Sequence, residues 1–211
     1  MVCMAINEDF EKLSTHPFST HFVQSIVKIF PVQNILGFFM KAQKSFLEFA
    51  VDKNAMCVLK HIIKRISKEE NNPIIVDVKK NLINSITLNT DKIIQDCFGN
   101  YVIQFCYEYF GEVKSSGITE MIIEKFVQFS LQKYSSSVVS KCISTYWKDK
   151  NCALKLKEVL KPEGITEMFR SREGNKILLD LLENYEHTPL RDKLINSLPL
   201  GESSKHFHER W

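Results

Sequence analysis

Two amides and an aromatic ring share one short stretch of the chain with the spacing of a helix face. Asn100 and Gln104 are four residues apart, and Tyr101 directly follows Asn100. An amide can both donate and accept hydrogen bonds at the edge of a nucleobase, and an aromatic ring offers a plane on which a base can stack. On a helix the two amides would lie one turn apart beside the ring. The pattern predicts a site that holds one flat base, and the alternative is a solvated polar face with an incidental tyrosine.

The helices that would carry such side chains are predicted by an apolar pattern that recurs five times. Each copy has apolar residues at i, i+1, i+4, i+5 and usually i+8, which is one face of an α-helix and cannot be one face of a strand. We call these five segments the framed helices and their first apolar residue position 0. The copies are 36, 44, 36 and 39 residues apart, starting at Phe22, Val58, Val102, Val138 and Ile177. The longest interval contains the polar stretch 67–73, which we expect to be an exposed loop.

Further amphipathic stretches between the framed helices, such as 74–86 and 121–129, predict a partner helix in each repeat. A hairpin of about 36 residues cannot bury its apolar faces alone, so stacked copies must do so. The predicted fold is all-α, an α-solenoid of about five helical repeats, and its alternative is an unrelated five-helix bundle. We expect one repeat domain over 1–211, with repeats near 10–45, 46–80, 81–115, 116–155 and 156–200 and a C-terminal tail at 201–211.

Three positions of each framed helix should point away from the core. At 100° per residue, positions −2, −1 and +2 lie together opposite the apolar face. We call them the first edge, stacking and second edge positions. The five triplets are Thr20, His21 and Gln24; Met56, Cys57 and Lys60; Asn100, Tyr101 and Gln104; Ser136, Ser137 and Ser140; and Asn175, Lys176 and Leu179.

The residues of these repeats resemble the Pumilio (PUF) family. The resemblance is specific in DCFGNYVIQ at 96–104 and QKYSSSVVSKCI at 132–143, and weaker in HPFSTHFVQ at 16–24, DKNAMCVLK at 52–60 and SREGNKILLD at 171–180. Family members usually have eight repeats, so the chain resembles either a short, divergent member or a member whose N-terminal repeats are absent from this sequence. The resemblance implies a curved arc whose concave face binds single-stranded RNA antiparallel to the chain, with one base per repeat.

The resemblance also implies which base a complete triplet reads. Asn and Gln with an aromatic between them read uracil in the family, which transfers to the third triplet. A small residue with Gln usually reads adenine there, so Thr20 and Gln24, with His21 as the stacking residue, would read adenine. Because only two triplets offer a well-placed stacking ring, we expect weaker RNA binding than is usual in the family.

The other triplets depart from the family pattern. Guanine-reading repeats pair Ser with Glu, whereas this chain pairs Ser136 with Ser140 and so lacks the carboxylate that guanine's donors need. We expect Lys60 to contact phosphate, with a solvated basic face as the alternative. Asn175 has no acceptor at its second edge position and Lys176 replaces the aromatic, so base reading there should be loose or absent.

By resemblance the function would be post-transcriptional regulation of messenger RNA, in translation or decay. The expected partners are U-containing 3′ untranslated regions, with protein co-regulators on the convex face, and the expected location is the cytoplasm. The alternative is a degenerate Pumilio-like scaffold that binds ribosomal RNA or protein without base readout during ribosome assembly, which would be nucleolar.

Composition and motifs exclude several other classes of protein. The 211 residues carry 28 Lys and Arg against 25 Asp and Glu, a net charge of +3 that suits an acidic partner only weakly. No apolar run long enough for a membrane span and no phosphate-loop, hydrolase or zinc-protease motif occurs, so we expect a soluble intracellular protein that is not an enzyme and has no cofactor. The six cysteines form no Cys-x-x-Cys pair, and His206 and His208 have no accompanying metal ligands, so we expect no metal site. Cys106 and Cys142 should be core residues.

Overall fold

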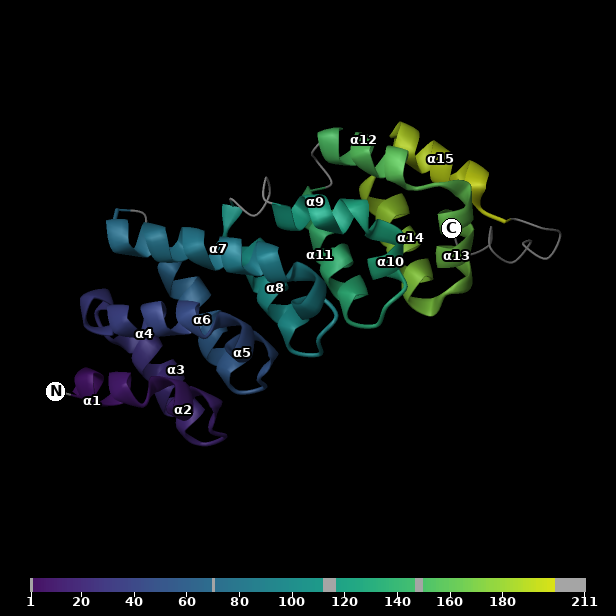
Figure 1. Ribbon diagram of the computed structural model, residues 1–211. Helices are drawn as coiled ribbons and strands as arrows, with labels where there is room; N and C mark the ends of the chain where they lie inside the picture. Colours follow the sequence, from purple (N-terminus) through teal and green to yellow (C-terminus); the bar gives the residue numbers. More distant parts are fainter. Residues whose placement is uncertain (1, 70, 112–116, 147–149, 200–211) are drawn as a thin grey trace. The chain divides into compact units, whose positions relative to one another are not determined.

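The computed structural model describes residues 2–69, 71–111, 117–146 and 150–199, and in these ranges it contains fifteen α-helices and no strand. The chain divides into two compact units, Met1–Met121 and Ile122–Trp211 (Figure 1). None of the helices in the described ranges has the length and apolar character needed to cross a membrane.

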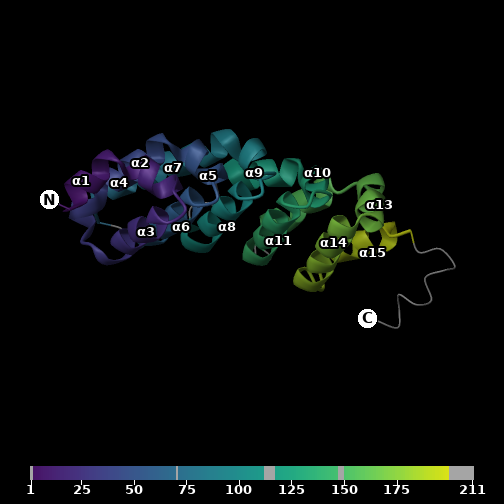
Figure 2. The same cartoon turned by 90° about the horizontal axis from the view of Figure 1, so that it is seen from below.

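The helices of the first unit lie in two layers. Its framed helices α3 (Ser19–Ile29), α6 (Ala55–Ile66) and α8 (Gly99–Tyr109) pack side by side in one layer (Figure 2). The other layer holds α1 (Val2–Glu8), α2 (Phe10–Thr15), α4 (Val32–Lys44), α5 (Phe46–Val51) and α7 (Pro73–Ile93), and α9 (Gly117–Glu124) follows.

The second unit repeats this arrangement with fewer helices. The framed helices α11 (Ser135–Tyr146) and α14 (Arg172–Asn184) pack against each other, and each contacts a preceding short helix. These preceding helices are α10 (Phe126–Ser130) and α13 (Pro162–Arg170), while α12 (Lys150–Val159) and α15 (Pro189–Ser197) pack together. All five framed helices are therefore confirmed.

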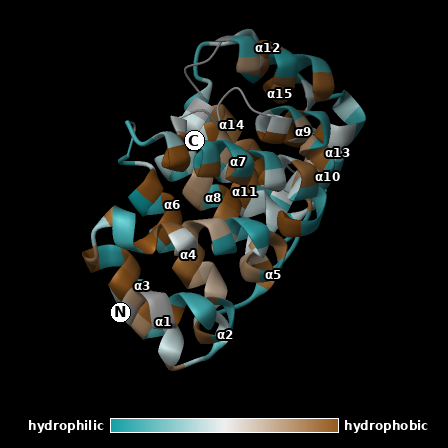
Figure 3. Ribbon diagram, turned by 60° about the vertical axis from the view of Figure 1, so that its left-hand side comes forward, coloured by the Kyte–Doolittle hydropathy of each residue, from teal (hydrophilic) through white to brown (hydrophobic). Residues whose placement is uncertain are grey.

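The framed helices bury the apolar face that the sequence predicts. In α6 the five frame residues are at most 1% exposed: Val58, Leu59, Ile62, Ile63 and Ile66. Hydrophobic and hydrophilic stretches alternate along these helices (Figure 3). The expectation fails at Phe22, which is 55% exposed although it occupies position 0 of α3. The equivalent Val58 of α6 is buried, and α6 packs against two framed helices, α3 and α8, whereas α3 is the first helix of its layer and packs against α6 alone.

The sequence predicts a single partner helix in each repeat, and for three repeats this prediction is wrong. In three repeats the helix breaks at one residue, Asp9, Ser45 or Lys125, where φ is −95° to −101° and ψ is 16° to 25°. The residue after each break is a phenylalanine that is at most 2% exposed: Phe10, Phe46 and Phe126. The break therefore turns the chain so that a large ring enters the core, and it makes these repeats three-helix units.

A small residue begins the turn into every framed helix. Position −3 is Ser19, Ala55, Gly99, Ser135 or Gly174, and in all of these repeats but that of Ala55 it lies against the backbone of the residue six positions earlier. The hydroxyls of Ser19 and Ser135 donate to the carbonyls of Leu13 and Phe129, at 3.1 and 2.7 Å. At Gly99 a Cβ would lie 2.6 Å from the carbonyl oxygen of Ile93. The close approach of the two backbones restricts this position to small side chains.

Candidate nucleic-acid interface

The turn that precedes each framed helix fixes the first edge residue at the start of that helix. Its backbone N–H donates to the carbonyl of the residue four positions earlier, at 2.8 to 3.3 Å in all five repeats. In the second and third repeats that earlier residue is an aspartate, Asp52 or Asp96, whose carboxylate also accepts from two further N–H groups at 2.8 to 2.9 Å. The edge positions of different repeats therefore occupy equivalent places on their helices.

On α8 a chain of hydrogen bonds sets the orientation of both edge amides. The Nδ2 of Asn100 donates to the Asp96 carbonyl at 2.8 Å, and the Nε2 of Gln104 donates to the Oδ1 of Asn100 at 3.0 Å. A carbonyl can only accept, so Asn100 must present its nitrogen to Asp96 and its oxygen to Gln104. Gln104 must then use its nitrogen in this bond, which leaves its Oε1 as a free acceptor.

The donors and acceptors of α8 that these hydrogen bonds do not use complement a uracil. The free Oε1 of Gln104 can accept the uracil N3–H, and the remaining amide hydrogen of Gln104 can donate to a uracil carbonyl. The ring of Tyr101, which is 47% exposed, offers a stacking surface beside them. The structure thus brings the three predicted residues of this triplet together with their donors and acceptors fixed before any base arrives.

The first repeat orients its glutamine in the same way without an amide at the first edge position. The hydroxyl of Thr20 donates to the Asn54 carbonyl at 3.1 Å and accepts from the Nε2 of Gln24 at 3.2 Å. Gln24 therefore presents Oε1 and one amide hydrogen, while His21 is exposed at the stacking position. The carbonyl that Thr20 bonds belongs to the turn before α6, so neighbouring repeats share this link.

Three of the five first edge residues are buried, whereas the sequence predicted that all five point away from the core. Thr20, Asn100 and Ser136 are 2%, 3% and 7% exposed. The helical-wheel estimate ignores the preceding turn, which folds over the start of the framed helix and covers this position. The surface that a base could meet is formed by the second edge residue and the exposed stacking residue, with the buried first edge residue orienting its partner.

The remaining three triplets do not form a bonded edge pair. In α6 the residues Met56, Cys57 and Lys60 are half-buried, and the Cys57 thiol lies 3.7 Å from the Lys53 carbonyl. In α11 Ser136 bonds the Lys133 carbonyl at 3.2 Å, Ser137 is exposed and Ser140 is half-buried. In α14 the Asn175 amide donates to the Phe169 carbonyl at 3.1 Å, beside an exposed Lys176 and a half-buried Leu179.

The sequence interpretation missed an aromatic residue beside the best triplet. The plane of the Phe105 ring is inclined by 25° to that of Tyr101 at a centroid distance of 6.5 Å, and the Lys60 ammonium lies 4.8 Å from the centroid of the Phe105 ring. This contact joins the second edge residue of α6 to the stacking surface of α8. The sequence does contain a signal for this contact, since Phe105 follows Tyr101 by one helical turn, whereas it predicts for Lys60 a phosphate contact or a solvated basic face.

The residues expected to have no chemical role behave as structural groups where they are described. Cys106 and Cys142 are buried as predicted, and burial raises the pKa of the Cys106 thiol. All six cysteines are free thiols. Among the described residues no cluster of three or more histidine, cysteine, aspartate or glutamate side chains could hold a metal ion. The tail at 201–211, with His206 and His208, lies outside the described residues.

Comparison with known proteins agrees with this architecture. The model of the "Pumilio-family RNA binding repeat" matches residues 9–34, 45–78 and 90–123, the segments that contain α3, α6 and α8. Pumilio homolog 12 of Arabidopsis thaliana is 27% identical over 75% of this chain, and Pumilio homology domain family member 4 of Saccharomyces cerevisiae is 22% identical over 82%. The chain spans only 25% and 19% of the lengths of these two relatives.

Solved structures show the same fold. The Puf4 RNA binding domain, bound to an HO endonuclease RNA 3′ UTR recognition sequence, superposes with a TM-score of 0.78 at 20% identity, covering 93% of this chain and 60% of that one. PUF-8, in complex with PBE-RNA, superposes with a TM-score of 0.72 at 18% identity, covering 90% and 54%. The chain therefore carries Pumilio-family repeats and folds as a Pumilio-type α-solenoid.

Proposed function

We propose that the chain binds single-stranded RNA through its framed helices and reads individual bases where the triplet is complete. The observation that carries this proposal is the bonded pair of Asn100 and Gln104, whose donors and acceptors are set by the Asp96 carbonyl. The oriented amide of Gln104 beside the exposed ring of Tyr101 matches the edge and the face of a single base.

The base proposed at α8 is uracil, and adenine is proposed at α3. Uracil offers an N–H donor next to a carbonyl acceptor, which suits the free Oε1 and the remaining amide hydrogen of Gln104. At α3 the hydroxyl hydrogen of Thr20 is donated to the Asn54 carbonyl, so Gln24 supplies the edge that faces the base and His21 supplies the stacking ring. One base per repeat is proposed for these two helices.

The cellular role proposed is post-transcriptional regulation of messenger RNA through 3′ untranslated regions. Support comes from the Puf4 structure, whose bound RNA is a 3′ UTR recognition sequence. The proposed location is cytoplasmic, and the layer that contains α4, α5 and α7 is proposed as the side available to co-regulator proteins.

A second candidate is a scaffold that binds ribosomal RNA or protein without reading bases, with a nucleolar location. It is favoured by the triplets of α6, α11 and α14, which form no bonded edge pair and place Cys57, Ser137 or Lys176 where an aromatic residue would stack. RNA binding by such a scaffold would depend on charge alone.

Changing Tyr101 to Ala separates the two candidates. Base–aromatic stacking is worth about 1–3 kcal/mol per base, so the change should weaken binding of a U-containing oligonucleotide of about eight nucleotides by about 10- to 100-fold. Tyr101→Phe keeps the ring and should bind within about twofold of the unmodified protein. Fluorescence anisotropy with the full chain at two salt concentrations measures both. Equal affinity in the Ala variant, with a steep salt dependence, would favour the scaffold.

A further inference from the structure

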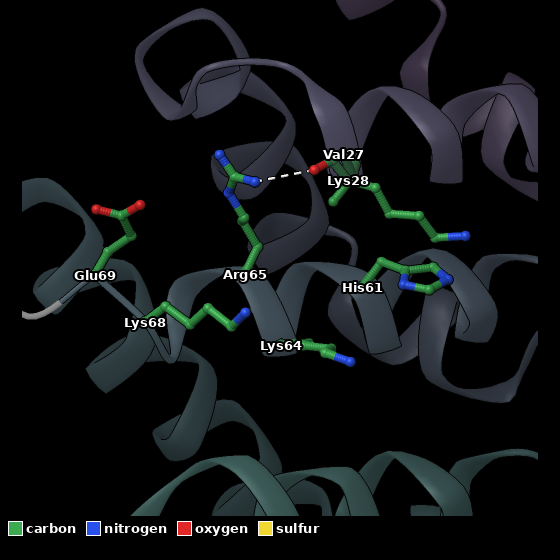
Figure 4. Close-up of a pocket in the computed structure, with 7 residues that line it drawn as sticks. All are labelled: Val27, Lys28, His61, Lys64, Arg65, Lys68 and Glu69. Atoms are coloured by element: carbon green, nitrogen blue, oxygen red, sulfur yellow. Dashed lines mark hydrogen bonds between the residues drawn. The ribbon is translucent and has the colours of Figure 1, made fainter.

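A small pocket lined mainly by positive charges lies at the C-terminal ends of α3 and α6, away from the edge residues. Its volume is about 180 Å³, below the roughly 300–1,000 Å³ of typical small-molecule sites, so it suits a compact chemical group. We call it the basic pocket. Its polar lining consists of Lys28, His61, Lys64, Arg65, Lys68 and Glu69 (Figure 4).

The arginine of the basic pocket is a fixed part of its wall. Arg65 donates to the carbonyl of Lys28 at 3.0 Å and to that of Phe30 at 3.2 Å, so it ties α6 to the last turn of α3. These carbonyls are neutral acceptors and leave the positive charge of the guanidinium uncompensated. The wall is therefore held in place before any ligand binds.

The lysines of the basic pocket have no ion-pair partner among the described residues. Lys28, Lys64 and Lys68 are exposed, and none forms a salt bridge to a carboxylate in the part of the chain that the structure describes. Glu69 is the one acidic residue in the lining, and it lies on the far side of Arg65 from Lys28 and His61 (Figure 4). Four cationic side chains thus surround a small space with one carboxylate at its margin.

The positive charges around the basic pocket also affect the pKa of its histidine, His61. Burial first, and then the charges of Lys28, Lys60 and Lys64, lower the pKa of His61 to about 4. The ring is therefore neutral near pH 7 and can donate one N–H to an anion without adding to the charge repulsion. A bound anion would offset the lysine charges and raise this pKa.

The basic pocket lies on the same helices as the base-reading positions. Lys28 and Lys64 each follow the stacking residue of their helix, His21 or Cys57, by seven residues. Seven residues are about two turns, so the lysines lie on the stacking side of the helix about 10 Å farther along its axis. A strand held at the edge positions of α3 could thus continue toward the pocket.

We propose that the basic pocket binds a backbone phosphate of the RNA segment that continues beyond the base held by α3. This proposal rests on the proposed RNA-binding function and adds a phosphate site distinct from the base-reading positions. If the RNA runs antiparallel to the chain, α3 holds the base nearest the 3′ end, and the phosphate in the pocket belongs to the 3′-flanking nucleotides.

The test compares a core oligonucleotide with versions lengthened by three nucleotides at the 3′ or the 5′ end. In the unmodified protein the 3′ extension should tighten binding about tenfold, as expected for a charge-assisted phosphate contact, and the 5′ extension should have little effect. In the variant K28Q/K64Q/K68Q the gain should disappear, and the slope of log K against log salt for the 3′-extended RNA should fall by about 0.7 per lost phosphate contact.

A variant with the same loss of charge provides the control. K44Q/K80Q/K92Q changes three exposed lysines of α4 and α7 outside the pocket and should keep the tenfold gain. A gain that persists in the pocket variant, or that is lost equally in the control variant, would overturn the phosphate site while leaving base reading intact. Failure of the unmodified protein to bind any of the RNAs would instead overturn the proposed function.

Inorganic phosphate and a 5′-phosphorylated RNA separate a free or terminal phosphate from a backbone phosphate. Each is titrated while the NMR signals of His61 are followed, and His61→Gln identifies those signals. Displacement of inorganic phosphate by the 3′-extended RNA supports the proposal. A shift with inorganic phosphate or the terminal phosphate, without any gain from the 3′ extension, would show a small-anion site and contradict a backbone contact.

Discussion

Changing Asn100 to Ser and Gln104 to Glu will move the preferred base at α8 from uracil toward guanine. The change replaces the amide acceptor and donors by a carboxylate that accepts two hydrogen bonds, which fits the adjacent N1–H and N2–H groups of guanine. A mismatched base costs about 1–3 kcal/mol in specific complexes, so the preference between U and G should reverse, each variant discriminating by about 10-fold or more. Competition binding with oligonucleotides that differ only at this base measures the ratio.

The single change Asn100→Ser is the matched control for this switch. It leaves Gln104 in place with a small residue at the first edge position, the combination that Thr20 and Gln24 form in α3. The preferred base should then move toward adenine and not toward guanine. A double variant that is folded by circular dichroism and still prefers uracil would contradict the assignment of Asn100 and Gln104 as base-reading residues.

Changing Gly99 to Val will destabilise the first unit by about 3 kcal/mol. A Cβ at Gly99 would lie 2.6 Å from the Ile93 carbonyl oxygen and 3.0 Å from its Cα, and backbone atoms cannot yield as a flexible side chain can. The turn that positions Asn100 must open to relieve this overlap. Thermal unfolding followed by circular dichroism should show a Tm lower by on the order of 10 °C, with weaker RNA binding at temperatures below the transition.

Gly111 provides the control for this steric effect. A Cβ there would have no other atom within 4 Å, and the residue is exposed. Gly111→Val should change the free energy of unfolding by no more than about 0.5 kcal/mol. Equal losses in the two variants would mean that glycine's chain flexibility, and not the close approach to Ile93, determines the effect.

Helix periodicity predicted the framed helices, because a helix face that is buried in every repeat requires apolar residues at the same spacing in every repeat. The frame residues Val58, Leu59, Ile62 and Ile63 of α6 are all buried, as the spacing requires. Phe22 has the same periodicity yet is exposed. Whether a residue at position 0 is buried depends on a neighbouring helix, and the pattern within one helix does not contain that information.

The breaks in the partner helices and the burial of the first edge residues could not be derived from periodicity. Ser45 and Lys125 are ordinary helix residues, and only the need to bring Phe46 and Phe126 into the core selects their non-helical ψ angles. The orientation of the Gln104 amide likewise depends on the Asp96 carbonyl, which reaches Asn100 through the turn. Sequence could identify which side chains meet, whereas the direction of their donors and acceptors is a tertiary property.

Base reading by α8 with a preset amide edge can be tested by selection from a random pool of single-stranded RNA. The selection uses the full chain at near-physiological salt and is repeated with Gln104→Ala. We predict enrichment of a short element with an obligatory U, and loss of the preference at that position alone in the variant. Recovery of bulk RNA without a motif, or the same motif from both proteins, would contradict base reading at α8.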